Sequence, residues 1–110
     1  MADLTVSTIT RSGIAPTYVA AAALGDAFVN TGRIFLHVKN GGGGSINVTV
    51  AEQVTADIAG YTATDLVVAV SAGAERMIGP FPRSAYNDSN GKVQVSYSDE
   101  TSVTVAALQL

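Results

Sequence analysis

The chain has 110 residues, of which 47% are hydrophobic and only 14% are charged, and its net charge is −3. This length fits one domain, residues 1–110, with a single core. An average soluble domain has about 25% charged residues, so the low charged share suggests that partners cover part of the surface. No apolar run approaches the roughly 20 residues of a membrane-spanning helix. The six basic residues are scattered, which argues against nucleic acid as a partner.

Cysteine is absent, which excludes disulfides and thiolate chemistry. The first residues contain neither the basic nor the apolar segment of a secretory signal. We therefore expect a protein that is made in the cytoplasm and stays there or leaves by another route.

Alternating patterns rich in valine and threonine, with turn signals about every 8 to 12 residues, predict an all-β fold. This spacing is typical of a sandwich or a barrel, and the pattern gives about eight strands in a single domain. The first strand is expected at residues 3–10. Residues 17–24 fit either a short strand or one helical turn, and residues 26–30 are a short apolar piece that ends at the turn signal Asn-Thr-Gly.

Residues 33–40 are the clearest strand, with alternate positions facing a core. Residues 45–52 alternate in the same way, and the glycines between the two segments predict a hairpin. Residues 53–65 have no clean period and are interpreted as a connection or a frayed strand. Residues 66–71 are almost continuously apolar, which predicts a strand buried on both faces.

Residues 74–78 predict a short strand. Residues 79–82 contain two prolines, which cannot donate ladder hydrogen bonds, so an ordered loop is expected there. Residues 87–91 end in Asn-Gly, a pair that favours a hairpin turn.

Two strands end the chain. Residues 92–98 place Val93, Val95 and Tyr97 inward. In residues 101–110 the apolar positions change face near the end of the strand, which predicts a bulge near Ala106.

His37 is the only histidine, so a nucleophilic triad or an acid–base pair would have to use it. It shares a strand face with Phe35 and Lys39, and we interpret it as a surface or interface residue. A metal site with one histidine needs carboxylates that converge on it, and no spacing in the sequence provides them. We therefore expect no catalytic residue, no cofactor and no metal.

Two places are candidates for contact with a partner. One is the strand face formed by Phe35, His37 and Lys39. The other is the rigid loop formed by Pro80, Phe81 and Pro82. Phe81 has two interpretations: it docks into a neighbouring molecule, or it folds back as a plug of the core.

Several phrases of the sequence resemble small β-sandwich proteins encoded among the head genes of tailed bacteriophages, in particular capsid decoration, or cement, proteins. They are residues 31–40, residues 73–82, residues 86–88 with 91–93, and the ending Thr-Ser-Val-Thr-Val-Ala-Ala-Leu. The resemblance extends over most of the chain, from Asp3 to Leu110.

The resemblance implies a non-enzymatic virion protein that binds the outer surface of the capsid shell, through the major capsid protein, and strengthens it. It implies a single-domain antiparallel β-sandwich, jelly-roll-like, with about eight strands. It also implies a homo-oligomer, with a trimer favoured. Alternatives are another virion component, such as a head–tail connector, a tail accessory protein or a head-fibre base. A small host-surface or carbohydrate-binding module is a further alternative, although tryptophan is absent and the four tyrosines are dispersed.

Overall fold

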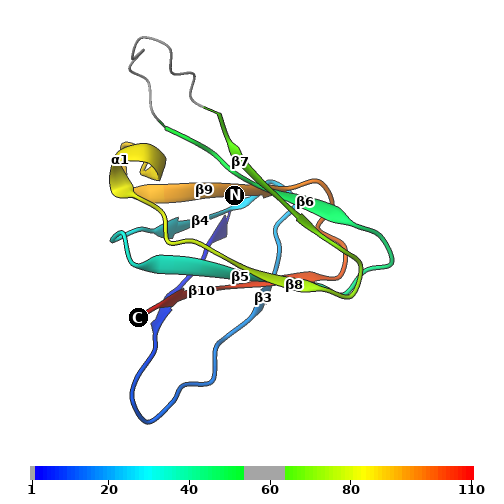
Figure 1. Cartoon of the computed structure of the whole chain (residues 1–110), viewed down its shortest axis with the longest axis horizontal. Coiled ribbons are helices and arrows are strands. Elements are labelled where there is room, and N and C mark those ends of the chain that lie inside the picture. The colour runs from blue at the N-terminus through cyan, green and yellow to red at the C-terminus, as the bar shows by residue number, and fades with distance from the viewer. Residues whose placement is uncertain (1, 54–63) are drawn as a thin grey trace.

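Strands form nearly all the regular structure of this computed structural model, which describes residues 2–53 and 64–110. They make two sheets packed face to face (Figure 1). Sheet A has the order β1 (Ala2–Asp3), β4 (Asp26–Val29), β9 (Lys92–Tyr97), β6 (Ile46–Val50) and β7 (Leu66–Val70). Sheet B has the order β2 (Val6–Thr8), β10 (Val103–Gln109), β5 (Ile34–Asn40) and β8 (Glu75–Ile78), and β3 (Val19–Ala20) also pairs with β10. The predicted all-β sandwich is confirmed.

The first predicted strand is in fact two strands in different sheets. β1 pairs in parallel with β4, and β2 pairs in parallel with β10, so the chain changes sheet at Leu4, whose side chain is buried in the core. These two parallel pairs correct the expectation of a wholly antiparallel sandwich. The split also helps to explain why the described part of the chain holds ten strands instead of about eight.

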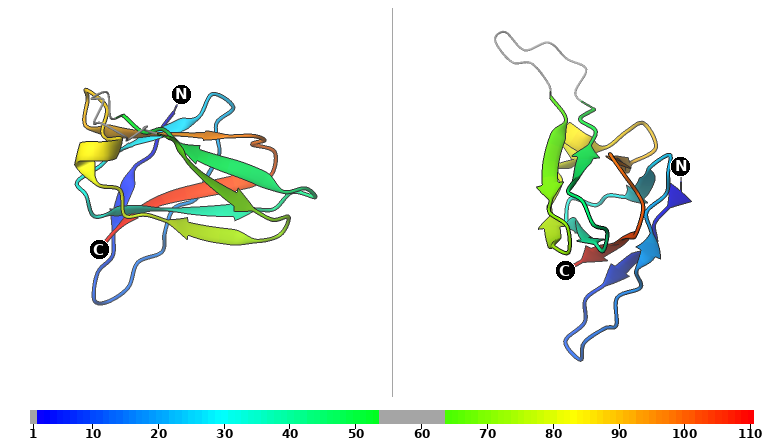
Figure 2. Two further views of the ribbon diagram at one scale, coloured as in Figure 1. Left: turned by 45° about the horizontal axis from the view of Figure 1, so that its top comes forward. Right: turned by 90° about the vertical axis from the view of Figure 1, so that its right-hand side faces the viewer.

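After β2 the chain leaves the sandwich and returns at β3. Figure 2 shows this segment, residues 9–18, extending away from both sheets. At its tip the N–H of Gly13 donates to the carbonyl of Thr10. Of the two interpretations of residues 17–24, the short strand is correct, since β3 pairs with β10 at Val19 and Ala20.

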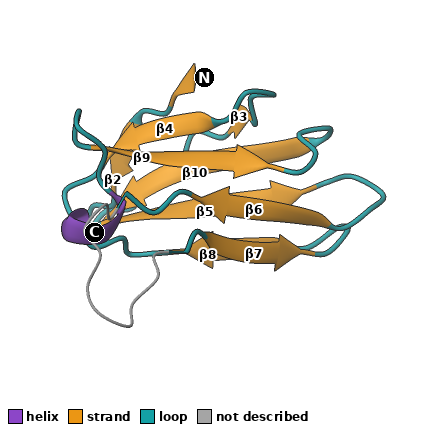
Figure 3. Ribbon diagram, turned by 90° about the horizontal axis from the view of Figure 1, so that it is seen from above, coloured by secondary structure: helices purple, strands orange, loops and turns teal. Residues whose placement is uncertain are grey.

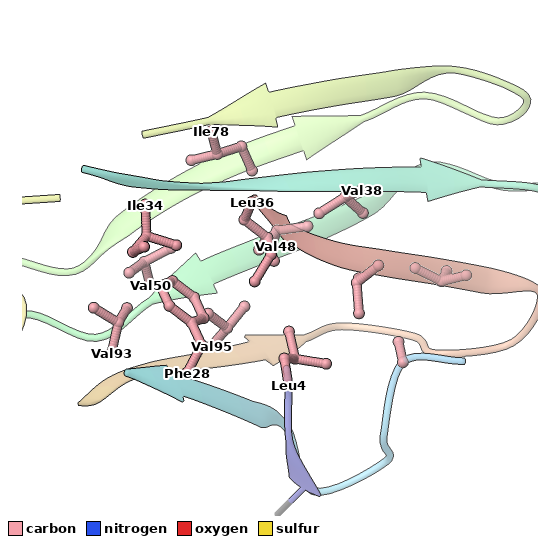
Figure 4. Close-up of a cluster of buried hydrophobic side chains, with 14 of the residues drawn as sticks. Leu4, Phe28, Ile34, Leu36, Val38, Val48, Val50, Ile78, Val93 and Val95 are labelled. Carbon is pink, nitrogen blue, oxygen red and sulfur yellow. The ribbon is translucent and has the colours of Figure 1, made fainter. Parts of the chain in front are cut away.

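The inward positions of both sheets form one core (Figure 4). The alternation expected for residues 33–40 and 45–52 is confirmed, because Leu36, Val38, Val48 and Val50 are fully buried. Each such side chain contributes about 1.5–3 kcal/mol by leaving water. The fully buried side chains come from both sheets and, for Phe81, from the loop between β8 and α1; they include Phe28, Ile34, Leu36, Val38, Val48, Val50, Val70, Phe81, Val93, Val95, Val103 and Val105.

The expected hairpin across the glycines is wrong. β5 pairs with β10 and β8 in sheet B, whereas β6 pairs with β7 and β9 in sheet A, so residues 41–45 cross from one sheet to the other. Asn40, which is 2% exposed, fixes this crossing, because its side-chain amide donates to the carbonyls of Gly44 at 2.8 Å and Val70 at 3.1 Å. Alternation identifies strands but does not identify their partners.

The turn at residues 87–91 forms as expected but joins no hairpin. It connects a short helix, α1 (Arg83–Tyr86), which the sequence did not predict, to β9. The carboxylate of Asp88 closes the turn by accepting from the backbone N–H groups of Asn90 and Lys92 at 2.8 and 3.0 Å. These bonds and one from Gln94 lower the pKa of Asp88, with the Lys92 N–H as the largest cause.

Two predictions about the last strands need correction. The outward side chains of β7 are not buried: Val67 is 54% exposed and Ala69 is also exposed. β7 lies at the margin of sheet A, and no other layer covers the outer face of the sheet there (Figure 3). β10 has no bulge near Ala106, because its pairing with β5 is unbroken from Val103 to Gln109. The change of face instead reflects burial on both sides of β10, where Ala106 and Leu108 are 3% and 4% exposed. Part of the connection expected at residues 53–65 lies outside the described residues.

Candidate functional site

The outer face of sheet B carries the predicted interface residues Phe35, His37 and Lys39. In the pairing register His37 lies between Ala106 of β10 and Met77 of β8. Phe35 and Lys39 are half-buried, but His37 is only 5% exposed. The structure thus brings these residues together on one face, yet the histidine itself is already covered.

Groups of this same chain cover His37. The hydroxyl of Tyr18 lies 2.6 Å from Nδ1, and a carboxylate oxygen of Glu75 lies 3.1 Å from Nε2. A single neutral tautomer satisfies both contacts: Tyr18 donates to Nδ1, and Nε2–H donates to Glu75. The ammonium of Lys39 lies 3.9 Å from the centre of the Tyr18 ring, a cation–π contact. Through Tyr18, this cluster anchors the C-terminal end of residues 9–18 to sheet B.

The loop of Pro80, Phe81 and Pro82 places its prolines and its aromatic ring differently. Both prolines are exposed, whereas Phe81 is 1% exposed. Its ring packs against Phe28 and Tyr86, with centroids 5.8 and 5.7 Å away. The side-chain amide of Asn30 donates to the Phe81 carbonyl at 2.9 Å and holds the loop. Phe81 therefore lies in the core, as the plug interpretation expects, and offers no free ring for docking.

The outer face of sheet A is a second surface with exposed side chains. The outward side chains of β6 and β7, together with positions 94 and 96 of β9, carry no charge. They are Asn47, Thr49, Val67, Ala69, Gln94 and Ser96, which we call the neutral face. At the opposite margin of the sheet, Lys92 pairs with Asp3 at 3.1 Å. Sequence reasoning did not single out the neutral face, because its members come from three separate strands.

A carboxylate lies buried at the inner side of sheet A. Asp26 is 1% exposed, and its Oδ2 accepts from the Tyr97 hydroxyl at 2.8 Å and from the Ala22 N–H at 3.2 Å. Its Oδ1 has no hydrogen-bond partner. Burial, together with the bond to the Asp26 carboxylate, raises the pKa of Tyr97 well above its usual value. Because this hydrogen bond joins β4 to β9 inside the sandwich, we assign the pair a structural role.

A cavity of about 290 Å³ opens where β2 and β3 separate along β10. Apolar residues such as Leu4 and Val19 line it, together with hydroxyl groups such as that of Thr17. Its one carboxylate, Asp3, is paired with Lys92. This mixed lining defines no specific ligand.

No group of three or more histidine, aspartate or glutamate side chains in residues 2–53 and 64–110 is arranged to hold a metal ion. In the same residues, no helix has the length and apolar character needed to cross a membrane. Neither a protein-family model, nor a curated protein, nor a solved structure matches the chain. A functional proposal therefore depends on the geometry of the chain itself.

Proposed function

We propose that the protein is a non-enzymatic structural component of a tailed-bacteriophage virion that binds the outer surface of the capsid shell and stabilises it. The neutral face carries this proposal. A chain with only 14% charged residues leaves six adjacent outward positions of sheet A without a single charge. None of these six side chains is itself charged, so contact with another protein does not require any of them to bring a charge out of water.

The other observations are compatible with this role. The sequence phrases at residues 31–40 and 73–82 resemble capsid decoration proteins, and decoration requires a stable domain with a contact surface and no catalytic group. The one histidine is engaged by Tyr18 and Glu75. The segment of residues 9–18 also extends beyond the sheets, where it is placed to reach a neighbouring molecule (Figure 2).

The test is binding to assembled shells. Purified protein is mixed with expanded capsids that lack it, and bound protein is measured by co-sedimentation and located by cryo-electron microscopy. We expect regular density on the outside of the shell and greater resistance of the shell to heat. No binding to expanded shells would refute the proposal, and a copy number far below that of the major capsid protein would favour a connector or tail position.

Two variants test the assigned face. Asn47→Glu with Ser96→Glu places two carboxylates on the neutral face, and we expect at least about tenfold weaker shell binding because these charges must be desolvated. Met77→Glu is the matched control, because Met77 is 65% exposed on the outer face of sheet B. Equal loss in both variants would contradict the assignment to sheet A.

A further inference from the structure

The outer edge of β7 is the feature that the proposed function leaves unexplained. β7 ends sheet A, and within the described residues it pairs only with β6 (Figure 3). A strand in this position presents unpaired N–H and C=O groups along one side, which form a template for another strand.

Natural proteins protect such edges with charged residues, proline, bulges or very short strands. β7 has none of these: its sequence is Leu-Val-Val-Ala-Val, and its register with β6 is unbroken over all five residues. Val67 is 54% exposed beside the exposed Ala69. The edge is therefore regular and apolar over all five residues.

The other margins of the described sheets are protected. β8 carries Glu75 and Arg76 and is followed closely by Pro80. β1 has only two residues, and its Asp3 is paired with Lys92. At the other margin of sheet B, β2 and β3 have only three and two residues. The contrast singles out β7 among the described strands.

We propose that β7 pairs in antiparallel fashion with β7 of a second copy of this chain, about a twofold axis at Val68. In this register Leu66 lies opposite Val70, and Val67 lies opposite Ala69, so apolar side chains meet along the whole strand. Just beyond it, Asp65 lies opposite Ser71, so no like charges face each other. The two copies of sheet A then form one continuous sheet, and the two neutral faces form one surface.

A second copy fits this edge better than an unrelated peptide because the strand is nearly symmetric about its centre. A twofold contact requires a surface that is complementary to itself. Leu66 and Val70 at the two ends are similar in size, and each outward pair combines Val67 with the small Ala69. The same five residues therefore satisfy both sides of the contact.

The test is the association state in solution, measured by sedimentation equilibrium and light scattering. We expect the wild-type protein to form a dimer, twice the 11.2 kDa chain mass. In the double variant Val67→Lys with Ala69→Lys, the introduced ammonium groups face each other twice across the axis, and dimerisation should weaken at least about tenfold. Both positions are exposed on the outer face, so the fold should persist, and circular dichroism verifies this.

A charge exchange makes the test specific. A second double variant, Val67→Glu with Ala69→Glu, should also be monomeric alone, but an equimolar mixture of the two variants should restore a heterodimer. Ser96→Lys, on the same face but on β9, is the control that should leave the dimer intact. If a double variant fails to fold, Ser71→Glu takes its place, because the new carboxylate lies opposite Asp65 of the second copy and both positions are exposed.

The inference is overturned if the wild-type chain remains monomeric up to about 1 mM. It is also overturned if a dimer or trimer persists unchanged in the lysine double variant, or if mixing restores nothing. Shell binding is a separate measurement, so failure here is distinguishable from failure of the proposed function.

Discussion

Gly25 occupies a position where the backbone has no room for a side chain. Its φ is +93°, in the left-handed region, and a Cβ placed there would overlap the carbonyl oxygen of Val95 on the neighbouring strand β9. The conformation alone costs about 1–2 kcal/mol for a residue with a Cβ. The overlap adds to that cost because backbone atoms within a sheet cannot easily move away.

We therefore expect Gly25→Ala to lower the free energy of unfolding by more than about 3 kcal/mol. Urea denaturation followed by circular dichroism measures this. Gly73→Ala is the matched control, because Gly73 has φ +72° but open space around its missing Cβ, and it should cost only about 1 kcal/mol. Similar losses in both variants would show that the contact with Val95 is unimportant.

Tyr97 and Asp26 provide a second prediction at this scale. Tyr97→Phe removes the hydroxyl that donates to a buried carboxylate whose other oxygen has no hydrogen-bond partner. We expect a loss of about 2 kcal/mol at neutral pH, the range for a hydrogen bond to a charged group. Tyr86→Phe is the control for loss of a tyrosine hydroxyl elsewhere.

The same pair predicts a dependence on alkaline pH. The pKa of Tyr97 is raised in the folded protein above its usual 10.0, so above pH 10 the unfolded chain releases this proton while the folded chain keeps it. The stability linked to this proton is complete below pH 10 and falls by about 1.4 kcal/mol per pH unit above it. In the Tyr97→Phe variant this slope is absent, so the two stability curves should converge as pH rises from 9 to 11.5. Parallel curves would refute the assignment.

At the scale of single residues, the sequence indicated that Tyr97 points inward but gave no sign of its partner. Asp26 lies 71 positions away from Tyr97, and the sequence around Asp26 predicts only a short apolar segment. His37 is similar. The strand face that it occupies was predictable, but the side chain that covers it is Tyr18, which lies in residues 17–24, where the sequence fits either a strand or a helical turn. Contacts between distant segments have no local pattern.

At the scale of elements, the position of the segment from Gly79 to α1 depends on the packing of the Phe81 ring. Phe81 is buried against Phe28 and Tyr86, so Phe81→Ala should cost about 3–5 kcal/mol, the range for removing a buried aromatic side chain. Met77→Ala removes a large apolar side chain that is 65% exposed and should change stability by less than about 0.5 kcal/mol. Thermal unfolding compares the two variants. A stable Phe81→Ala protein that loses an oligomer would instead support the docking interpretation.

The positions of most strands were predictable, because β5, β6, β9 and β10 show clear alternation. Their partners were not, since the glycine run after β5 permits either a hairpin or a crossing between sheets. The sequence pattern also does not show that residues 3–10 divide into β1 and β2. Leu4 continues the alternation of a single strand, although its burial marks the point where the chain changes sheet.

For the whole molecule, the low charge has a measurable consequence. If the neutral face mediates shell binding, the contact contains few charges for salt to screen. We expect the dissociation constant to change less than about twofold between about 50 mM and about 500 mM salt. Surface plasmon resonance on immobilised shells measures this, and a tenfold weakening would indicate that a charged surface of the molecule makes the contact.

The position of β10 also has a consequence for how the molecule is made. This strand lies inside sheet B, between β5 on one side and β2 and β3 on the other, yet it is synthesised after all of them. β2, β3 and β5 therefore cannot complete their pairing until β10 is available, and long-range pairing of this kind folds slowly. The nascent chain should stay sensitive to protease until residues 103–109 have left the ribosome, and then become resistant in one cooperative step.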